Sequence, residues 1–359
     1  MDPRVNEHAR IAVDHSTGVE TGDDVLVQAP PEAMDLVVAL HEVIGERDAT
    51  AMHVSHSSRA GRAFERAIDP EAYTLPEHQL AAMEAADVAI NIRASANTKG
   101  SADVDPEVTA RTREVEKPIQ EEMMETTWVI TQHPAPGNAQ EAEMSTEAYA
   151  DFVYDAVNKD WEAQRAFHEN MVEILEDADE VHVVSGDTTD VSMSVAGMIP
   201  GNDYGEYNLP GGEAYTAPVP DSVEREVLFD KPVLTLGREL EDVYLRFEGG
   251  EVVDHAAAKN EDVLTSVLET DAGARRLGEL GIGMNRDIDR FTYNTLFDEK
   301  MGDTIHLAIG RAIDWTVPDD RPFNDSAVHL NMIVDMSEDS FIEVDGEVVQ
   351  RDGTFGFEE

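Results

Sequence analysis

Five residues in the second half of the chain have side chains that bind metal ions, and each stands among small or apolar residues. They are Glu213 in LPGGEAYTAP, Glu279 in RRLGELGIGMN, Glu299 and His306 in LFDEKMGDTIHLAIG, and His329 in SAVHLNMIVD. A neutral imidazole nitrogen is a good ligand for Zn, Co, Mn or Fe, and carboxylates commonly complete such sites. The chain contains no cysteine, so any metal must be held by histidine, aspartate and glutamate.

Each of these residues has an ordinary structural explanation when it is taken alone. A histidine in a buried strand is commonly a satisfied core residue, and Glu213 fits an exposed turn. Glu279 fits a helix-end carboxylate paired with Arg275 or Arg276. Glu299 lies in a charged run that is typical of a solvated face. The metal-site prediction therefore depends on two histidines and several carboxylates occurring together in similar settings.

The last of these segments offers one further oxygen donor. Alternation along a strand places His329, Asn331 and Ile333 on the same face. A carboxylate two residues after His329 would be a natural second ligand, but Asn331 is neutral and a weaker oxygen donor. Asp335 shares this face but lies roughly 20 Å farther along the strand, which is too far to replace it. Asn331 is therefore a possible weak ligand.

The elements around these residues are predicted to be mostly β-strands. From about Ser185, short alternating segments such as YLRFEGG and SFIEVDGEVV lie between Gly, Asp and Pro turns. The DG pairs at 345–346 and 352–353 predict hairpins. We expect an α+β domain over residues 186–359, with a mostly antiparallel or barrel-like sheet that carries the metal site and one helix near 264–277.

The first half alternates β-rich runs with helical patterns, which predicts an α/β domain over residues 1–185 with a mostly parallel sheet. A long amphipathic helix is expected after Ser145, a favourable N-cap. No G-x-G-x-x-G follows a strand, so no dinucleotide cofactor is predicted. The expected strands cover residues 25–29, 49–56, 88–94, 128–132 and 181–184, and the expected helices cover 33–46, 77–86 and 106–122.

The charge of the chain restricts its environment and its partners. Among 359 residues, 26 are Lys or Arg and 76 are Asp or Glu, for a net charge of −50. In molar salt the Debye length is about 3 Å, so self-repulsion costs little, and this composition predicts a halophilic protein. Such a surface repels phosphates, which argues against nucleic-acid or anionic-membrane partners. Without an apolar run of about 18 residues or a signal-peptide pattern, a cytoplasmic location is expected.

Taken in order, these segments resemble the aminopeptidase T family of metallopeptidases, in a form typical of halophilic archaea. LPGGEAYTAP resembles the family's G-E-x-x-T-A-P turn, and the segment ending in RRLGELGIGMN resembles its G-E-x-x-x-G-x-N motif. LFDEKMGDTIHLAIG and SAVHLNMIVD resemble its two histidine strands. WVITQHPAPGNAQEAEMSTEAYADFVYDAV and IEVDGEVVQRDGTF resemble stretches before and after this site, so the resemblance covers nearly the whole chain.

The resemblance implies a homodimeric enzyme that removes N-terminal residues from peptides and holds two bridged metal ions in its second domain. Glu213 and Glu279 match carboxylates at the metal centre, and either one is a candidate for catalytic proton transfer. His306 and His329 match the histidine ligands. Glu299 matches a further ligating glutamate, although it precedes His306 by seven residues. One or two divalent ions, Zn, Co or Mn, are expected.

Two positions depart from the family pattern. Asn331 stands where an aspartate ligand is expected, which weakens one metal position. Ile313 stands where a tyrosine stabilises the transition state, and losing such a donor typically costs on the order of 10²–10³ in rate. Two other functions therefore remain open: a catalytically impaired binding or scaffold dimer, and an Fe(II) ring-cleaving dioxygenase of the same fold that uses two histidines and one carboxylate.

Overall fold

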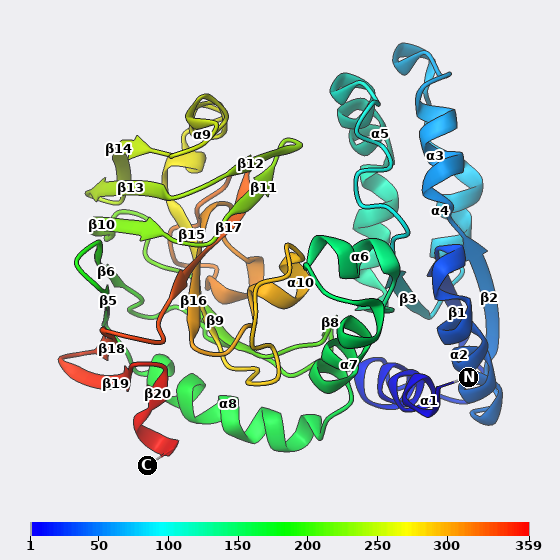
Figure 1. The fold of residues 1–359 in the computed structure, drawn as a ribbon, viewed down its shortest axis with the longest axis horizontal. Helices are drawn as coiled ribbons and strands as arrows, with labels where there is room; N and C mark the ends of the chain where they lie inside the picture. Colours follow the sequence, from blue (N-terminus) through cyan, green and yellow to red (C-terminus); the bar gives the residue numbers. More distant parts are fainter. Residues whose placement is uncertain (1, 359) are drawn as a thin grey trace. The chain divides into compact units, whose positions relative to one another are not determined.

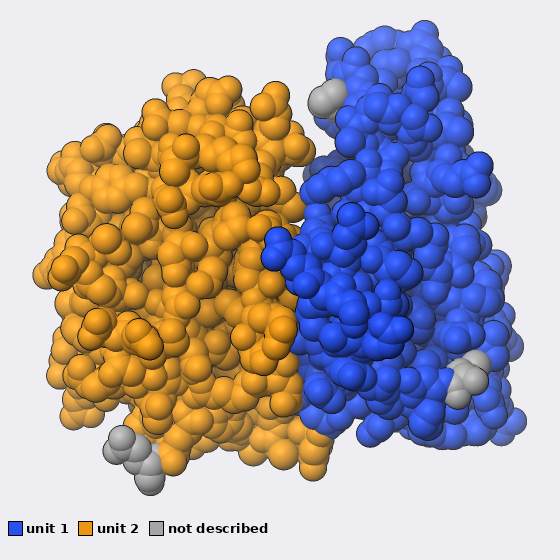
Figure 2. Space-filling model, in the orientation of Figure 1, with its two compact units in different colours: residues 1–159, 205–211 blue, residues 160–204, 212–359 orange. Residues whose placement is uncertain are grey.

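The structure, a computed structural model, describes residues 2–358. These residues form two compact units, which Figure 2 shows in different colours. The first unit runs to Lys159 and includes Gly205–Gly211. The second unit comprises Asp160–Tyr204 and the chain from Gly212 onward. Each unit is built around its own sheets (Figure 1).

The first unit is built on a five-stranded sheet in the order β2-β1-β3-β4-β8, and every neighbouring pair is parallel. Its strands are β1 (Asp24–Ala29), β2 (Thr50–Ser55), β3 (Val88–Arg93), β4 (Thr127–Gln132) and β8 (Asn208–Leu209). The central strands contain continuous aliphatic runs, and Val27 and Ile90 are fully buried. Such runs are expected where a parallel sheet is covered on both faces. The predicted α/β fold is confirmed.

Helices alternate with these strands along the chain. They are α1 (Pro3–Arg10), α2 (Met34–Glu46), α3 (Ser58–Glu65), α4 (Glu77–Glu84), α5 (Pro106–Glu125), α6 (Pro136–Glu141) and α7 (Thr146–Val157), with short turns η1 (Ile11–Ser16), η2 (Pro31–Ala33) and η3 (Pro70–Ala72). Ser145 caps α7, because its hydroxyl accepts a hydrogen bond from Ala148 N at 3.1 Å. Within residues 2–358, no helix combines the length and the apolar character needed to cross a membrane.

The single long helix expected after Ser145 is interrupted. α7 ends at Val157, and α8 (Trp161–Glu176) begins after Asp160. The Asp160 carboxylate accepts a hydrogen bond from Ala163 N at 3.0 Å, so this residue starts a new helix.

The second unit contains three antiparallel sheets: an eight-stranded sheet in the order β14-β13-β10-β6-β5-β18-β19-β20, a five-stranded sheet in the order β17-β16-β15-β9-β7, and the pair β11-β12. The mostly antiparallel second domain is thus confirmed. Its strands are β5 (Glu180–Ser185), β6 (Thr189–Ser194), β7 (Gly201–Asp203), β9 (Glu213–Thr216), β10 (Glu224–Phe229), β11 (Val233–Thr235), β12 (Arg238–Leu240), β13 (Val243–Glu248), β14 (Glu251–Ala256), β15 (Leu277–Gly283), β16 (Thr304–Gly310), β17 (His329–Asp335), β18 (Ser340–Val344), β19 (Glu347–Arg351) and β20 (Thr354–Phe355). Its helical segments are α8, α9 (Glu261–Leu268), η4 (Gly273–Arg275), α10 (Thr295–Asp298), η5 (Asp314–Thr316) and η6 (Gly356–Glu358).

Helix α8 and strand β5 precede the boundary expected near residue 185, yet both pack within the second unit. β5 pairs with β6 on one side and with β18 on the other, inside the eight-stranded sheet. Met171 and Leu175 of α8 belong to the same hydrophobic core as Val181 of β5. Burial of this helix face holds residues 160–185 against the second unit.

The two hairpins predicted in the second unit are confirmed, whereas the predicted helix is partly wrong. Both DG hairpins are confirmed, because residues 345–346 join β18 to β19 and residues 352–353 join β19 to β20. The helix predicted near 264–277 is wrong in its second half, since α9 ends at Leu268 and β15 begins at Leu277. The segment LGELGIG forms a strand because its backbone is paired on both sides, to β9 and to β16.

The five-stranded sheet has one apolar face and one polar face. Leu280, Ile282, Leu307 and Met332 point to the apolar face and are buried in a core that also contains residues of the eight-stranded sheet. Since successive side chains of a strand point in opposite directions, the residues between them lie on the other face. The hydrophobic core therefore decides which residues of these strands form the polar face.

Replacing Leu307 with alanine should lower the free energy of unfolding by about 2–5 kcal/mol, because it leaves a cavity at a fully buried position of a central strand. Urea denaturation at constant KCl measures this change. Leu236→Ala is the matched control, since Leu236 is 73% exposed and its truncation should change stability by less than about 0.5 kcal/mol. Equal effects of the two substitutions would contradict the assignment of the apolar face.

Candidate metal centre

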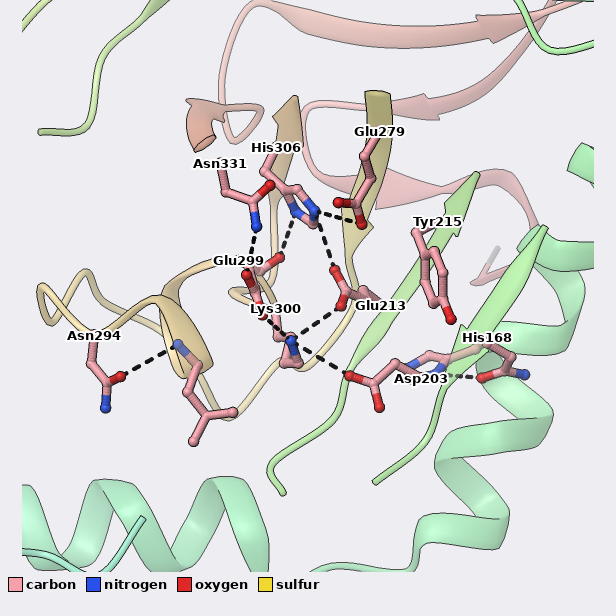
Figure 3. Close-up of polar contacts among 12 residues, drawn as sticks. His168, Asp203, Glu213, Tyr215, Glu279, Asn294, Glu299, Lys300, His306 and Asn331 are labelled. Atoms are coloured by element: carbon pink, nitrogen blue, oxygen red, sulfur yellow. Dashed lines mark hydrogen bonds and ion pairs between the residues drawn. The ribbon is translucent and has the colours of Figure 1, made fainter. Parts of the chain in front are cut away.

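Three buried side chains meet on the polar face of the five-stranded sheet. Glu213 comes from β9, Glu279 from β15 and His306 from β16, which are adjacent strands (Figure 3). His306 Nε2 lies 3.5 Å from Glu213 Oε2 and 3.5 Å from Glu279 Oε1. One ligand atom from each of the three residues lies within 4.8 Å of the others. A single metal ion can therefore be reached by all three side chains.

His329 extends this cluster from β17, the next strand of the sheet. Its Nε2 lies 3.2 Å from Glu279 Oε2. The two oxygens of Glu279 thus face two different imidazoles, those of His306 and His329. This carboxylate has the position needed to contact two neighbouring ions.

Backbone carbonyl groups fix the orientation of both imidazoles. His306 Nδ1 lies 3.0 Å from the carbonyl oxygen of Glu299, and His329 Nδ1 lies 2.9 Å from that of Arg311. A carbonyl oxygen only accepts, so both Nδ1 atoms carry the hydrogen and donate it. When a ring is neutral, its lone pair is then on Nε2, which faces the carboxylates. This second contact is the usual way in which proteins orient histidine ligands.

Gly281 leaves room for the His306 imidazole. It is paired with His306 across β15 and β16. A Cβ atom at this position would lie 1.9 Å from His306 Cε1, so any other residue would displace the ring. The glycine of the GELGIG motif is therefore a spatial requirement of the site.

Asn331 and Glu299 form a second layer beside the cluster. Asn331 Nδ2 donates a hydrogen bond to Glu299 Oε2 at 2.9 Å. This contact leaves the buried Oδ1 of Asn331 without a hydrogen-bond partner among the described residues. The structure therefore directs the Glu299 side chain to Asn331 and Lys300, while the Glu299 carbonyl orients His306.

Lys300 is a fully buried lysine at the base of the cluster. Its Nζ lies 3.1 Å from Glu213 Oε1 and 3.5 Å from Asp203 Oδ2, and it also contacts Glu299 Oε1. An unpaired buried ammonium would be very unfavourable, so these three carboxylates are what keeps Lys300 charged. The fourth carboxylate of the cluster, Glu279, does not contact Lys300 and is paired with the two histidines.

The protonation equilibria of the cluster show its excess of negative charge. Burial alone would lower the pKa of His306, but Glu213 and Glu279 more than offset it and raise that pKa to about 9. Burial raises the pKa of Glu213 to about 8, against the opposing effect of Lys300 and His306. For Glu279, burial acts upward, but hydrogen bonds to His306 and His329 hold its pKa below the usual range.

The residues present fit a divalent metal ion. Glu213 Oε2 is buried and has no hydrogen-bond partner among residues 2–358, and Asn331 Oδ1 is in the same condition. Without a metal ion, each histidine Nε2 must carry a hydrogen to bond the carboxylate oxygens that it faces, and a metal ion would take the place of that hydrogen. A bound cation would satisfy these groups together and reduce the excess negative charge.

Of the residues singled out from the sequence, the structure brings together Glu213, Glu279, His306 and His329. Sequence analysis missed Lys300, because it lies in a charged segment that reads as a solvated face. Its rarity is the only signal, since the chain has six lysines against 76 acidic residues. Nothing in the sequence near Asp203 marks it as part of this network.

This geometry, two oriented imidazoles and two buried carboxylates on a rigid sheet, defines the class of protein as a metal-dependent enzyme. The family of thermophilic metalloproteases (M29) matches residues 1–355. The chain belongs to this family, which assigns to it a divalent metal ion and peptidase activity.

Known proteins of similar sequence or structure agree with this assignment. Aminopeptidase T of Thermus aquaticus is 28% identical over 98% of this chain and 95% of its own length. The structure of wild-type AmpT from Thermus thermophilus matches 99% of both chains with a TM-score of 0.88 and 25% identity. A 2,5-dihydroxypyridine dioxygenase of Pseudomonas putida matches 99% of this chain and 97% of its own, with a TM-score of 0.65 and 14% identity. The last similarity shows a shared fold alone.

Replacing Lys300 with methionine should destabilise the metal-free protein by about 3–5 kcal/mol, because three buried carboxylates lose their common cation. Added Mn²⁺ or Zn²⁺ should recover part of this loss, since a bound ion supplies positive charge. Denaturation with and without metal measures both effects. Lys259→Met removes an exposed lysine that also contacts two glutamates, and it should change little. A Lys300 variant as stable as wild type would contradict this description.

Proposed function

We propose that this protein is an aminopeptidase that releases N-terminal residues from short peptides with the help of one or two divalent ions. Membership in the metalloprotease family supports the hydrolysis of peptide bonds. The observation that carries the proposal is the convergence of Glu213, Glu279 and His306 on one buried point. Aminopeptidase T of Thermus aquaticus is similar over nearly the whole chain, which supports cleavage at the N-terminus.

We assign the stronger metal position to Glu213, Glu279 and His306, which offer two carboxylates and one imidazole. Glu279, His329 and Asn331 would hold a second, weaker ion. Nitrogen and carboxylate donors suit Zn, Co or Mn. The Asn331 amide brings no negative charge, so the second ion should be held less tightly than the first.

The side chains around the two metal positions have different chemical roles. A bound divalent ion would lower the pKa of a water molecule and polarise the carbonyl of the scissile bond. Either Glu213 or Glu279 could carry a proton from the water to the leaving nitrogen, and Glu213 is the better candidate, because Glu279 is held between two imidazoles. Glu279 is held as an anion by two imidazoles and serves better as a ligand.

The charge of the cluster also favours a substrate with a free amino group. Asp203, Glu213, Glu279 and Glu299 together outnumber the one ammonium of Lys300. A carboxylate that the bound metal ions do not fully offset would bind a substrate ammonium and repel a substrate carboxylate. Such a contact would restrict cleavage to the first peptide bond of a chain.

We further propose that the enzyme works as a homodimer in a salt-rich cytoplasm. The net charge of −50 supports the salt adaptation, because such an excess is tolerated best where ions screen it. The dimer is proposed from the resemblance of the chain to the aminopeptidase T family.

Purified protein in multi-molar KCl should release N-terminal residues from a peptide library when Co²⁺, Mn²⁺ or Zn²⁺ is added. Liquid chromatography with mass spectrometry detects the shortened peptides. His306→Ala should lose both the activity and the bound metal, whereas His182→Ala, on β5, should keep both. Folded wild-type protein that cleaves no peptide with any of these ions, and binds less than about 0.2 ion per chain, would favour the scaffold function instead.

Replacing Asn331 with aspartate should raise the affinity of the weaker metal position by on the order of tenfold or more, because it adds an anionic ligand. Equilibrium dialysis followed by elemental analysis gives the number of ions and their affinities. Asn294→Asp makes the same chemical change at the N-cap of α10 and should leave metal binding unaltered. Unchanged affinity in the Asn331 variant would remove this residue from the metal site.

A further inference from the structure

Tyr215 lies on the polar face of the five-stranded sheet, close to the metal ligands. It follows Glu213 by two residues in β9, so both side chains point to the same face. In the cross-strand row, Tyr215 is paired with Gly281, and Gly281 is paired with His306. Figure 3 shows the Tyr215 ring beside the carboxylates of Glu213 and Glu279. The His306 ring lies over Gly281, and the Tyr215 ring lies over Gly201, its partner on β7.

Two neighbours hold the phenol in place. The indole nitrogen of Trp315 donates a hydrogen bond to Tyr215 Oη at 2.9 Å. On the other side, a Cβ atom at Gly201 would lie 2.2 Å from Tyr215 Cζ and 2.6 Å from Oη, so only glycine leaves room for the phenol there. The hydrogen bond from Trp315 and the space over Gly201 therefore set one position for the Tyr215 hydroxyl.

The direction of the Trp315 hydrogen bond matters for what Tyr215 can do. An indole N–H only donates, so Tyr215 Oη is the acceptor and retains its own hydrogen. None of the described residues accepts this hydrogen. A phenol has an ordinary pKa of about 10, so the group carries its hydrogen at neutral pH. The metal face therefore carries an oriented donor with an unused hydrogen.

We propose that the Tyr215 hydroxyl donates a hydrogen bond to the oxygen of the scissile carbonyl as negative charge develops on it. This inference rests on the proposed peptidase function and makes Tyr215 a catalytic residue, with Trp315 as its positioning residue. Donors placed where charge develops stabilise the transition state more than the ground state. The side chain of Ile313 has no such donor, and the loop that contains it instead brings Trp315 to Tyr215.

The reaction balances without proton transfer from Tyr215. A water oxygen attacks the carbonyl carbon, gives its proton to Glu213, and the π electron pair moves to the carbonyl oxygen. Tyr215 donates a hydrogen bond to this oxygen and keeps its proton. When the C=O bond re-forms, the C–N bond breaks and the leaving nitrogen takes the proton from Glu213.

The test is Tyr215→Phe, which removes one oxygen atom and keeps the ring. We expect kcat to fall by about 10²–10³, as for the loss of one oxyanion donor, with KM changed by less than about threefold. Metal content and thermal stability should match wild type. Tyr244→Phe is the control, because Tyr244 also uses its hydroxyl in a hydrogen bond, to Glu226 at 2.6 Å, but lies on β13 in the other sheet.

Calorimetry separates a transition-state contact from a structural role. A phosphonate analogue of the peptide, with tetrahedral oxygens, should bind Tyr215→Phe more weakly by a factor similar to the loss in kcat. The product amino acid should bind both forms alike. Trp315→Phe should reduce kcat less, and its effect should vanish in the Tyr215→Phe background if the indole acts through Tyr215.

The outcomes distinguish this inference from the proposed function. If wild type is active and Tyr215→Phe has the same kcat and the same phosphonate affinity, the inference about Tyr215 is wrong, but the proposed function stands. A loss confined to KM, or one accompanied by loss of metal, would overturn it as well. A wild type that cleaves no peptide would count against the proposed function, and the phosphonate titration would still decide whether Tyr215 meets a tetrahedral oxygen.

Discussion

The site depends on how a buried excess of negative charge is compensated. Four carboxylates meet in a region where Lys300 is the one buried ammonium, and each of them would be costly to bury alone. Lys300 neutralises part of this charge permanently, at the base of the cluster. The remaining excess is concentrated on the side of Glu279 and the two imidazoles, where Nε2 atoms and carboxylate oxygens face each other. The fold thus forms a buried site that a bound cation would stabilise.

The position of these groups follows from the hydrophobic core on the other face of the same sheet. Leu280 and Ile282 on β15 point into that core, which turns Glu279 and Gly281 to the polar face. The same alternation on β16 sets His306 opposite Leu307. A shift of register by one residue would exchange the two faces, so burial of apolar side chains specifies the candidate metal ligands as strictly as it specifies the core.

The sequence was sufficient for the α/β first unit, the antiparallel second unit and the choice of four candidate metal ligands, because these follow from periodicity and from residue types in apolar settings. The sequence was insufficient for features that depend on contacts between residues far apart in the chain. Residues 160–185 lie in the second unit because α8 and β5 bury their apolar faces there. Glu279 was compatible with a helix end, and only pairing with β9 and β16 makes it part of a strand. Lys300 and Tyr215 acquire their importance from partners far away in the chain, Asp203, Glu213 and Trp315.

The departure at Asn331 is consistent with this balance of charge. Asn331 donates to Glu299, and an aspartate there would place a fifth carboxylate against Glu299, which only a second bound cation would compensate. The amide instead satisfies Glu299 through Nδ2 and still presents Oδ1, which has no hydrogen-bond partner among residues 2–358. The metal-free protein is thereby less strained by repulsion, at the cost of weaker binding in one position. Salt screens exposed charges but reaches this buried cluster poorly. Added salt would therefore weaken repulsion on the acidic surface and would leave compensation of the site to Lys300, Asn331 and a bound metal ion.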